Sequence, residues 1–236
     1  MGANVLVDEV DVLARRLVAL VGLAMRESAE RRLSMALPGG STAETLLLPL
    51  AAAPLDWKRW DFFWGDERAV APDHPDSNYG LSQRLFLGPI GAEARQVHRT
   101  RAEGPDLEAA AKDYEAEMVA VLGHPPRLDF ALMGMGPDGH VCSLFPGHQA
   151  LREATRQVLA VTDSPKPPPR RVTLSLPALV ATRVLCVAAF GESKAEALQA
   201  ALEDPGSALP VAHLARRQAE THFLLDPAAA SRLSRS

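Results

Sequence analysis

The amino-acid sequence predicts an α/β fold built around a largely parallel β-sheet. Short apolar runs with the length of strands alternate along the chain with longer segments of helical periodicity. Four of the strand-like runs end in polar residues that include glycine. This alternation is typical of βαβ units, whose successive strands lie parallel in one sheet.

The length and composition are those of one globular domain. A chain of 236 residues is long enough for one full α/β core and short for two domains of usual size, so we expect a single domain over residues 1–236. The formal net charge of −4 gives no reason to expect nucleic acid or an anionic membrane as a partner. The two cysteines, Cys142 and Cys186, form no disulfide framework and no CxxC pair, which suits a reducing cytoplasm.

Export or anchoring in a membrane is not expected. The apolar run 13–25 is interrupted by Arg15 and Arg16 and preceded by acidic residues, which is the wrong flank for a signal peptide. The later run 179–190 contains Arg183 and is too short to span a bilayer. We therefore expect a cytoplasmic protein.

The secondary-structure elements follow in order from the amino terminus. Residues 4–7 form a short apolar run, and apolar side chains at helical spacing follow from Asp11, which predicts a strand and then a helix. The apolar residues 33–37 stop at a Pro-Gly-Gly turn, after which residues 41–48 resume a helical pattern. The remaining predictions are strands at 61–64, 128–133, 171–176, 184–190 and 222–225, and helices at 106–122 and 193–202.

The loops that follow the strands are the expected location of a ligand site. In an open parallel sheet the ligand binds beyond the carboxyl ends of the strands, where the connecting loops gather. Four polar loops are expected at this edge, residues 38–44, 65–68, 134–140 and 191–194. The proline-rich residues 165–169 precede another strand and predict a rigid surface loop.

The first loop contains Gly39, Gly40, Ser41 and Thr42, with Glu44 three residues after the serine. Serine and glutamate at this spacing predict a capping box that opens a helix. A helix cap and nothing more is one interpretation. The other is that the glycines let an anion approach backbone N–H groups at the positive end of the helix, which favours a phosphate or an oxyanion.

The second loop places Asp66, Glu67 and Arg68 directly after an apolar strand. A surface turn held by ion pairs explains these charges as well as a ligand site does. The polar residues 76–79 follow within reach of the same rim. The three charged residues are therefore candidates for substrate binding.

The third loop satisfies the dinucleotide-binding pattern G-x-G-x-x-G with Gly134, Gly136 and Gly139. That interpretation is weakened by Pro137 inside the turn and by the Phe-Pro-Gly sequence at 145–147, because a long helix should follow the glycines. The acidic residue expected about 20 positions further on also has no good counterpart. We therefore do not expect a nucleotide.

The same loop offers His140 as a candidate base. Histidine has an unperturbed pKa near neutrality, which suits a general base acting on water. A single loop histidine is often incidental. The glycines before His140 and the nearby Asp138, which could orient the ring, favour a catalytic role.

Cations near the other loops predict a phosphate site. Lys194 follows Gly191 at the start of a predicted helix, where a positive charge is unfavourable unless an anion lies nearby. Arg171, beside the proline-rich segment, is a further candidate, and Lys166 and Arg170 are neighbouring cations. No metal-ligand or nucleotide-phosphate motif occurs with suitable spacing, so we expect neither a metal nor another cofactor.

Taken together, these loops resemble one family, the 6-phosphogluconolactonases, within the wider group that includes the glucosamine-6-phosphate deaminases. The resemblance runs from Leu37 to about Asp226. Its motifs are LPGGSTAETL (37–46), WGDERAV (64–70) with DSNYG (76–80), LMGMGPDGHVCSLFPGH (132–148), PKPPPRRVTLSLPAL (165–179) and GESK (191–194). The likeness implies a three-layer, modified Rossmann-like fold with a mostly parallel sheet, helices on both faces and no nucleotide.

The resemblance implies hydrolysis of 6-phospho-D-glucono-1,5-lactone to 6-phosphogluconate in the pentose phosphate pathway. By matching position, His140 would be the catalytic base, while Arg68, Arg171 and Lys194 would bind the phosphate or orient the substrate. The partner would be a small sugar phosphate, and the protein would be a monomer or a homodimer.

Two other functions remain open at this point. A glucosamine-6-phosphate deaminase would share the glycine loop and the Asp-Gly-His element. Relatives of that enzyme carry an acidic residue soon after the histidine, whereas residues 141–146 here read VCSLFP. A non-catalytic sugar-phosphate sensor would keep the cations and could lose the base, so the presence of His140 argues against it.

Overall fold

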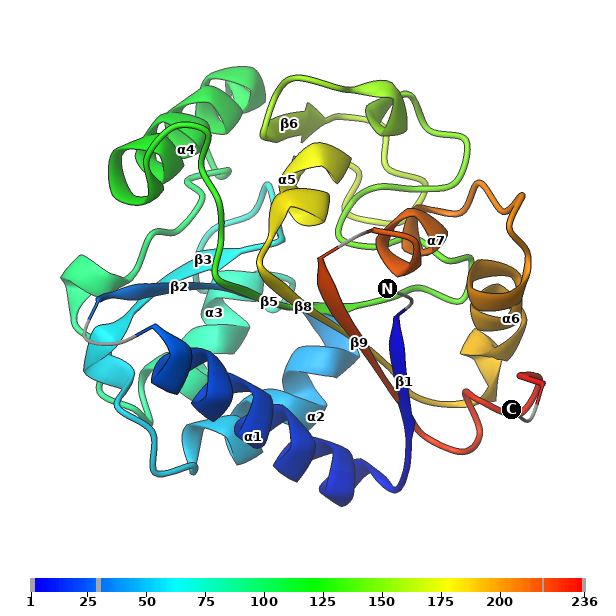
Figure 1. Cartoon of the computed structure of the whole chain (residues 1–236). Coiled ribbons are helices and arrows are strands. Elements are labelled where there is room, and N and C mark those ends of the chain that lie inside the picture. The colour runs from blue at the N-terminus through cyan, green and yellow to red at the C-terminus, as the bar shows by residue number, and fades with distance from the viewer. Residues whose placement is uncertain (1–2, 29–30, 218, 235–236) are drawn as a thin grey trace.

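The computed structural model describes residues 3–28, 31–217 and 219–234. Its centre is a six-stranded sheet in the order β1-β9-β8-β5-β2-β3, and every neighbouring pair of strands is parallel (Figure 1). The strands are β1 (Asn4–Val7), β2 (Leu33–Leu37), β3 (Trp60–Trp64), β5 (Phe130–Gly134), β8 (Val184–Ala189) and β9 (Glu220–Leu225). The prediction of a largely parallel sheet is confirmed.

Helices cover both faces of this sheet (Figure 1). One face carries α1 (Val10–Glu27), α2 (Gly40–Ala51) and α3 (Asn78–Ser82). The other carries α4 (Leu107–Leu122), α5 (Leu176–Ala181), α6 (Ala195–Glu203) and α7 (Pro210–Ala215). Each face has its own hydrophobic core. No helix in the described part of the chain combines the length and apolar character needed to cross a bilayer.

Sequence pattern accounts for the layers. Strands covered on both faces must be apolar throughout, and every residue of β2 and β3 is buried. Helix α1 has only one covered side, so it is amphipathic: Leu13, Leu17 and Val21 are buried at successive turns, whereas Arg15 and Arg16 are exposed.

A second, small sheet lies beside the parallel one. It contains β4 (Asp66–Arg68), β7 (Arg171–Leu174) and β6 (Val158–Val161), paired antiparallel in that order. The prediction of a loop at 66–68 is therefore wrong. The strand predicted over 171–176 also ends early, because Ser175 caps α5 by accepting a hydrogen bond from the Ala178 backbone N–H.

The chain reverses the direction in which it builds the parallel sheet between β2 and β5. After β2 it adds β3 on one side, and it later adds β5 and β8 on the other. The loops that leave β2 and β5 therefore diverge and open a crevice at the carboxyl ends of these strands. Gly39 follows β2 and Gly136 follows β5 at this position.

Candidate active site

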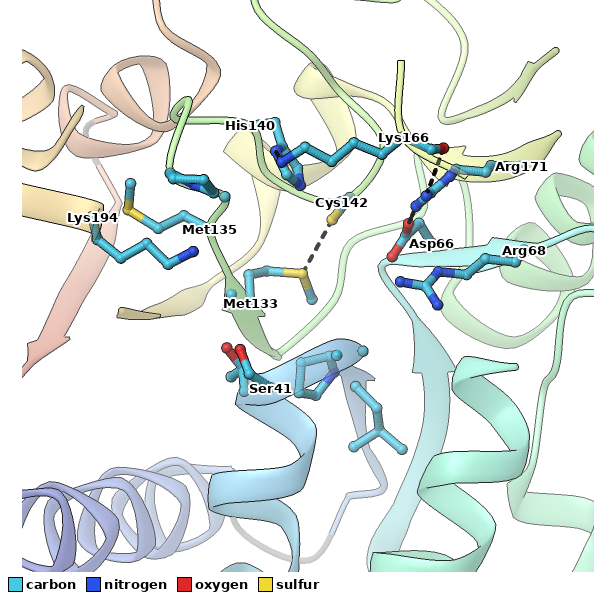
Figure 2. A pocket seen from close by; sticks show the side chains of 18 residues that line it. Ser41, Asp66, Arg68, Met133, Met135, His140, Cys142, Lys166, Arg171 and Lys194 are labelled. Carbon is cyan, nitrogen blue, oxygen red and sulfur yellow. Dashed lines mark hydrogen bonds and ion pairs between the residues drawn. The ribbon is translucent and has the colours of Figure 1, made fainter. Parts of the chain in front are cut away.

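A pocket of about 220 Å³ lies at this reversal point, and the four predicted polar loops all contribute to it (Figure 2). Of the predicted site residues, the ones that line it are Gly39, Gly40, Ser41, Thr42, Asp66, Arg68, His140, Arg171 and Lys194. Lys166 from the proline-rich segment joins them. The prediction that these loops meet in space is confirmed, whereas the chemical role of each residue stays a prediction.

His140 and Asp138 form a hydrogen-bonded pair. Asp138 Oδ1 lies 2.5 Å from His140 Nδ1, which fixes the tautomer that carries its proton on Nδ1. The ring packs against Phe145 with 4.6 Å between ring centroids, and a Cβ on Gly136 would clash with the imidazole. Nε2 hydrogen-bonds no described residue, so its lone pair is available to a ligand.

The pKa of His140 lies below its usual value. Burial of the ring is the largest cause, and the carboxylate of Asp138 opposes it without outweighing it. Burial alone would raise the pKa of Asp138, but the hydrogen bond and charge of His140 and other lowering contacts together outweigh it, so the pKa is lowered. The pair therefore consists of a neutral imidazole and a carboxylate at neutral pH.

The amino end of α2 faces the pocket without a side-chain cap. The predicted capping box does not form: Gly39 is the N-cap and α2 begins at Gly40, and no side chain among the described residues accepts a capping hydrogen bond. Gly40 has φ +57°, a backbone conformation that glycine adopts readily and that a residue with a Cβ rarely adopts. The uncapped N–H groups of the first turn are therefore donors for an anion.

Asn78 is one of the polar residues 76–79 that were expected within reach of this rim, and it supports the pocket from behind its lining. Its side chain packs so closely against Gly39 that a Cβ there would clash with it. Asn78 Nδ2 donates to the backbone oxygen of Asp66 at 2.9 Å and contacts Asp66 Oδ1 at 3.2 Å. The amide thus joins the glycine turn after β2 to strand β4.

Glu67 does not reach the pocket, although it was predicted to bind substrate. Side chains alternate along a strand, so Glu67 points away from the side shared by Asp66 and Arg68. Its buried carboxyl accepts bonds from the backbone N–H groups of Asn78 and Tyr79, both at 2.8 Å. Burial raises the pKa of Glu67 and these N–H groups oppose the rise. Glu67 therefore holds the start of α3 in place.

Arg171 is buried, and its guanidinium binds the backbone of the proline-rich segment. It donates to the carbonyl oxygens of Lys166, Pro167 and Pro168 at 2.9 to 3.1 Å, and it lies 3.6 Å from Asp66 Oδ2. Burial lowers the pKa of Arg171. By contrast, Arg170 turns outward and donates to the Pro105 carbonyl.

Two further predicted cations lie on opposite sides of the pocket (Figure 2). Arg68 extends from β4 and donates to the Asp76 carbonyl at 2.7 Å. Lys194 ends the short 3-10 turn Glu192–Lys194 that precedes α6, so the predicted helix at 193–202 starts later than expected. Burial and the nearby Lys166 lower the pKa of Lys194.

Cys142 in the pocket lining and its neighbour Ser143 carry little signal in the sequence. Ser143 Oγ donates to Asp66 Oδ2 at 2.7 Å and fixes that carboxylate. Cys142 has φ +54°, an uncommon backbone conformation for a residue with a Cβ, and its Sγ lies 3.3 Å from Met133 Sδ. In the described residues 140–157, which follow Gly139, the one helical segment is the 3-10 turn Gln149–Arg152. Within the described residues, no three His, Cys, Asp or Glu side chains gather as metal ligands would.

Comparisons with known proteins agree with this architecture. The family model described as glucosamine-6-phosphate isomerases/6-phosphogluconolactonase matches residues 8–223. The 6-phosphogluconolactonase of Streptomyces coelicolor is 42% identical over 216 residues, which cover 86% of this chain and 83% of that one. The Mycobacterium tuberculosis 6-phosphogluconolactonase is 41% identical over 230 residues, covering 93% and 92%.

A solved structure gives the same result for the fold. The 6-phosphogluconolactonase of Trypanosoma brucei superimposes with a TM-score of 0.86 at 28% identity, covering 98% of this chain and 99% of that one. The predicted α/β fold, with a mostly parallel sheet between helices, is confirmed. The chain belongs to the glucosamine-6-phosphate isomerase/6-phosphogluconolactonase family.

Proposed function

We propose that this protein hydrolyses 6-phospho-D-glucono-1,5-lactone to 6-phosphogluconate, with His140 as the general base. The observation that carries the proposal is the Asp138–His140 pair, whose Nε2 is available at a pocket lined by four cationic side chains. The relatives named 6-phosphogluconolactonase support the substrate, since they match this chain over most of its length.

The proton path follows from the tautomer. Asp138 accepts the Nδ1–H bond, so Nε2 presents a lone pair that removes a proton from water as its oxygen attacks the lactone carbonyl. Because burial lowers the pKa of His140, the neutral form is available below the usual imidazole pKa. The imidazolium that forms then donates its Nε2 proton to the ring oxygen as the C–O bond breaks, which restores the base.

The oxyanion and the phosphate need separate donors. The uncapped N–H groups at the start of α2 can stabilise the oxyanion, because they are fixed before the reaction. Arg68 and Lys194 are our candidates for the phosphate, since backbone carbonyls already engage the Arg171 guanidinium and Lys166 lies against the Asp138–His140 pair. Arg171 would instead orient the segment that carries Lys166.

The deaminase alternative lacks a carboxylate in the right place. Residues 141–145, which follow His140, contain no acid, and Asp66 is the one carboxylate among the described residues that line the pocket. Asp66 is held by Ser143 and faces Arg171, so it is poorly placed to exchange protons with a substrate. The site therefore favours lactone hydrolysis over aldose–ketose isomerisation.

The test follows the loss of 6-phosphogluconolactone against its spontaneous hydrolysis, with glucosamine 6-phosphate assayed in parallel. We expect acceleration of lactone loss only, and His140→Ala should lower kcat by about 10²- to 10⁴-fold with a modest change in KM. If the protein binds the lactone but does not accelerate its loss, it is a sugar-phosphate sensor. Ammonia release from glucosamine 6-phosphate would identify a deaminase, and either result would overturn the proposal.

A further inference from the structure

Lys166 stands directly beside the proposed base. Its Nζ lies 3.4 Å from His140 Nδ1, and the two side chains lie beside each other in Figure 2. The same Nζ lies 3.6 Å from Asp138 Oδ1. The contact comes from a segment whose backbone is fixed. Arg171 donates to the Lys166 carbonyl, and Ser164 Oγ accepts the Lys166 N–H at 3.3 Å and donates to the same carbonyl at 3.0 Å.

The contact between Lys166 and His140 opposes protonation of the ring. When Nδ1 donates its proton to Asp138, both Nδ1–H and the ammonium are donors, so no hydrogen bond joins them. The His140 ring and the Lys166 ammonium instead both lie next to the Asp138 carboxylate. A carboxylate beside an imidazole stabilises the imidazolium, whereas an ammonium at the same distance destabilises it and offsets part of the carboxylate's charge.

The other charged groups around His140 are further away or already paired. Asp66 on β4 favours the imidazolium, but it accepts the Ser143 hydroxyl and faces Arg171. The guanidinium of Arg171 on β7 lies 6.0 Å from the ring centroid of Phe145, and Phe145 in turn packs against the His140 ring. Lys194, from the turn before α6, lines the same pocket. Leu209, the residue before α7, lies next to Gly139 of the loop that carries His140, and its side chain is apolar.

We propose that Lys166 is a positioning residue that adds to the effect of burial and extends to lower pH the range in which His140 is unprotonated, by countering the carboxylate that orients the ring. Asp138 alone would fix the imidazole but also stabilise its charged form, which cannot accept a proton. With Lys166 in contact, Asp138 still orients the ring, and a smaller fraction of the imidazole is protonated. The same balance agrees with the directions in which Asp138 and Lys166 shift the pKa of His140. The inference rests on the proposed function only for the statement that His140 is the base.

The decisive measurement is a proton NMR titration of His140, with its Cε1–H signal assigned by its loss in His140→Ala. Lys166→Met should raise the pKa of His140 by about half a pH unit or more, given partial solvent screening of a lysine that is 40% exposed. Lys166→Arg, which keeps the charge, should leave it nearly unchanged. Arg170→Met is the matched control, because that cation is next to Arg171 in sequence but turns away from the pocket.

The same variants give a kinetic readout. If His140 is the base, the acid limb of kcat/KM in Lys166→Met should move to higher pH in step with the NMR titration. A His140 titration that is identical in the wild type and Lys166→Met would overturn the inference, even if activity fell, since Lys166 would then act on the substrate. The titration needs no substrate, so a protein without lactonase activity could still confirm the effect of Lys166 while the proposed function failed.

Discussion

At the scale of single residues, the site combines groups with opposite effects on one imidazole. Asp138 orients His140 and favours its charge, while burial and Lys166 disfavour that charge. Arg171 acts one step further out, since its guanidinium fixes the carbonyls of the segment that presents Lys166. Removing any one of these groups should therefore change the pH dependence of the reaction as well as its rate.

Asp138→Asn tests the orienting role. The variant loses the carboxylate that accepts the Nδ1 proton, so we expect kcat to fall by about 10²- to 10⁴-fold. It also loses a charge that raises the pKa of His140, so the remaining activity should have its acid limb at lower pH than the wild type. The measurement is a pH profile of kcat/KM.

A matched control exists in a second aspartate–histidine pair outside the pocket. Asp163 Oδ1 lies 3.0 Å from His148 Nε2, and neither residue lines the pocket. Asp163→Asn should leave kcat and its pH profile as in the wild type. A similar loss in both aspartate variants would mean that the effect is not specific to the base.

Not all of the site could be predicted from the sequence, and particular residues show why. Glycines and cations that directly follow strands, such as Gly39 and Lys194, could be predicted because the ends of parallel strands converge. Asn78 and Ser143 act through contacts with Asp66 that no local pattern encodes. The direction of Glu67, away from the pocket, could not be predicted because it depends on strand β4.

At the scale of elements, the parallel strands are long apolar runs and could be predicted, whereas the small antiparallel sheet could not. Strand β4 has three residues, all charged, so neither apolar alternation nor length marks it as a strand. It exists because β7 supplies its hydrogen-bonding partner from more than a hundred positions later in the chain. The same pairing brings Arg68 and Arg171 to one rim.

His98 links two elements and makes a pH-dependent contribution to stability. It stacks on Phe63 of β3 and lies between Asp61 of β3, at 3.3 Å, and Glu117 of α4, at 2.8 Å. Burial alone would lower the pKa of His98, but the hydrogen bonds to both carboxylates outweigh it, so the pKa is raised. The charged ring therefore stabilises the junction of α4 with the sheet.

The sign of this effect determines its pH window. Because the pKa of His98 is higher in the folded protein, its contribution is fully present below about pH 6.5, the usual imidazole value, and is lost as the pH rises through the raised value. His98→Gln should lower the free energy of unfolding more at pH 6 than at pH 8.5 or so, as measured by urea denaturation. An equal loss at both values would show that the charge of His98 contributes nothing.

At the scale of the whole molecule, a chain with a net charge of −4 concentrates positive charge in one crevice. The pocket is lined by Arg68, Lys166, Arg171 and Lys194 and by one described carboxylate, Asp66. The electrostatic attraction for a phosphorylated substrate is therefore local. A single domain, a cytoplasmic location and a monomeric or homodimeric state stay predictions.

Salt should weaken substrate binding. Raising the ionic strength from about 0.01 to about 0.5 M shortens the Debye length from about 30 to about 4 Å, so KM for the phosphorylated lactone should rise several-fold with little change in kcat. The unphosphorylated lactone is the control, because its KM should be nearly independent of salt. Lys194→Met should reduce the salt dependence, and an unaltered dependence would remove Lys194 from the phosphate site.

The placement of the pocket between two hydrophobic cores has a consequence for refolding. All three tryptophans, Trp57, Trp60 and Trp64, belong to the core on the α1 and α2 side of the sheet. Recovery of their fluorescence after denaturation therefore reports only that half of the molecule. His140 and Lys166 depend on the loop after β5 and on β7, which pack into the core on the other face. Enzymatic activity consequently reports the completed structure, and during refolding it can return together with the fluorescence or after it, but not before.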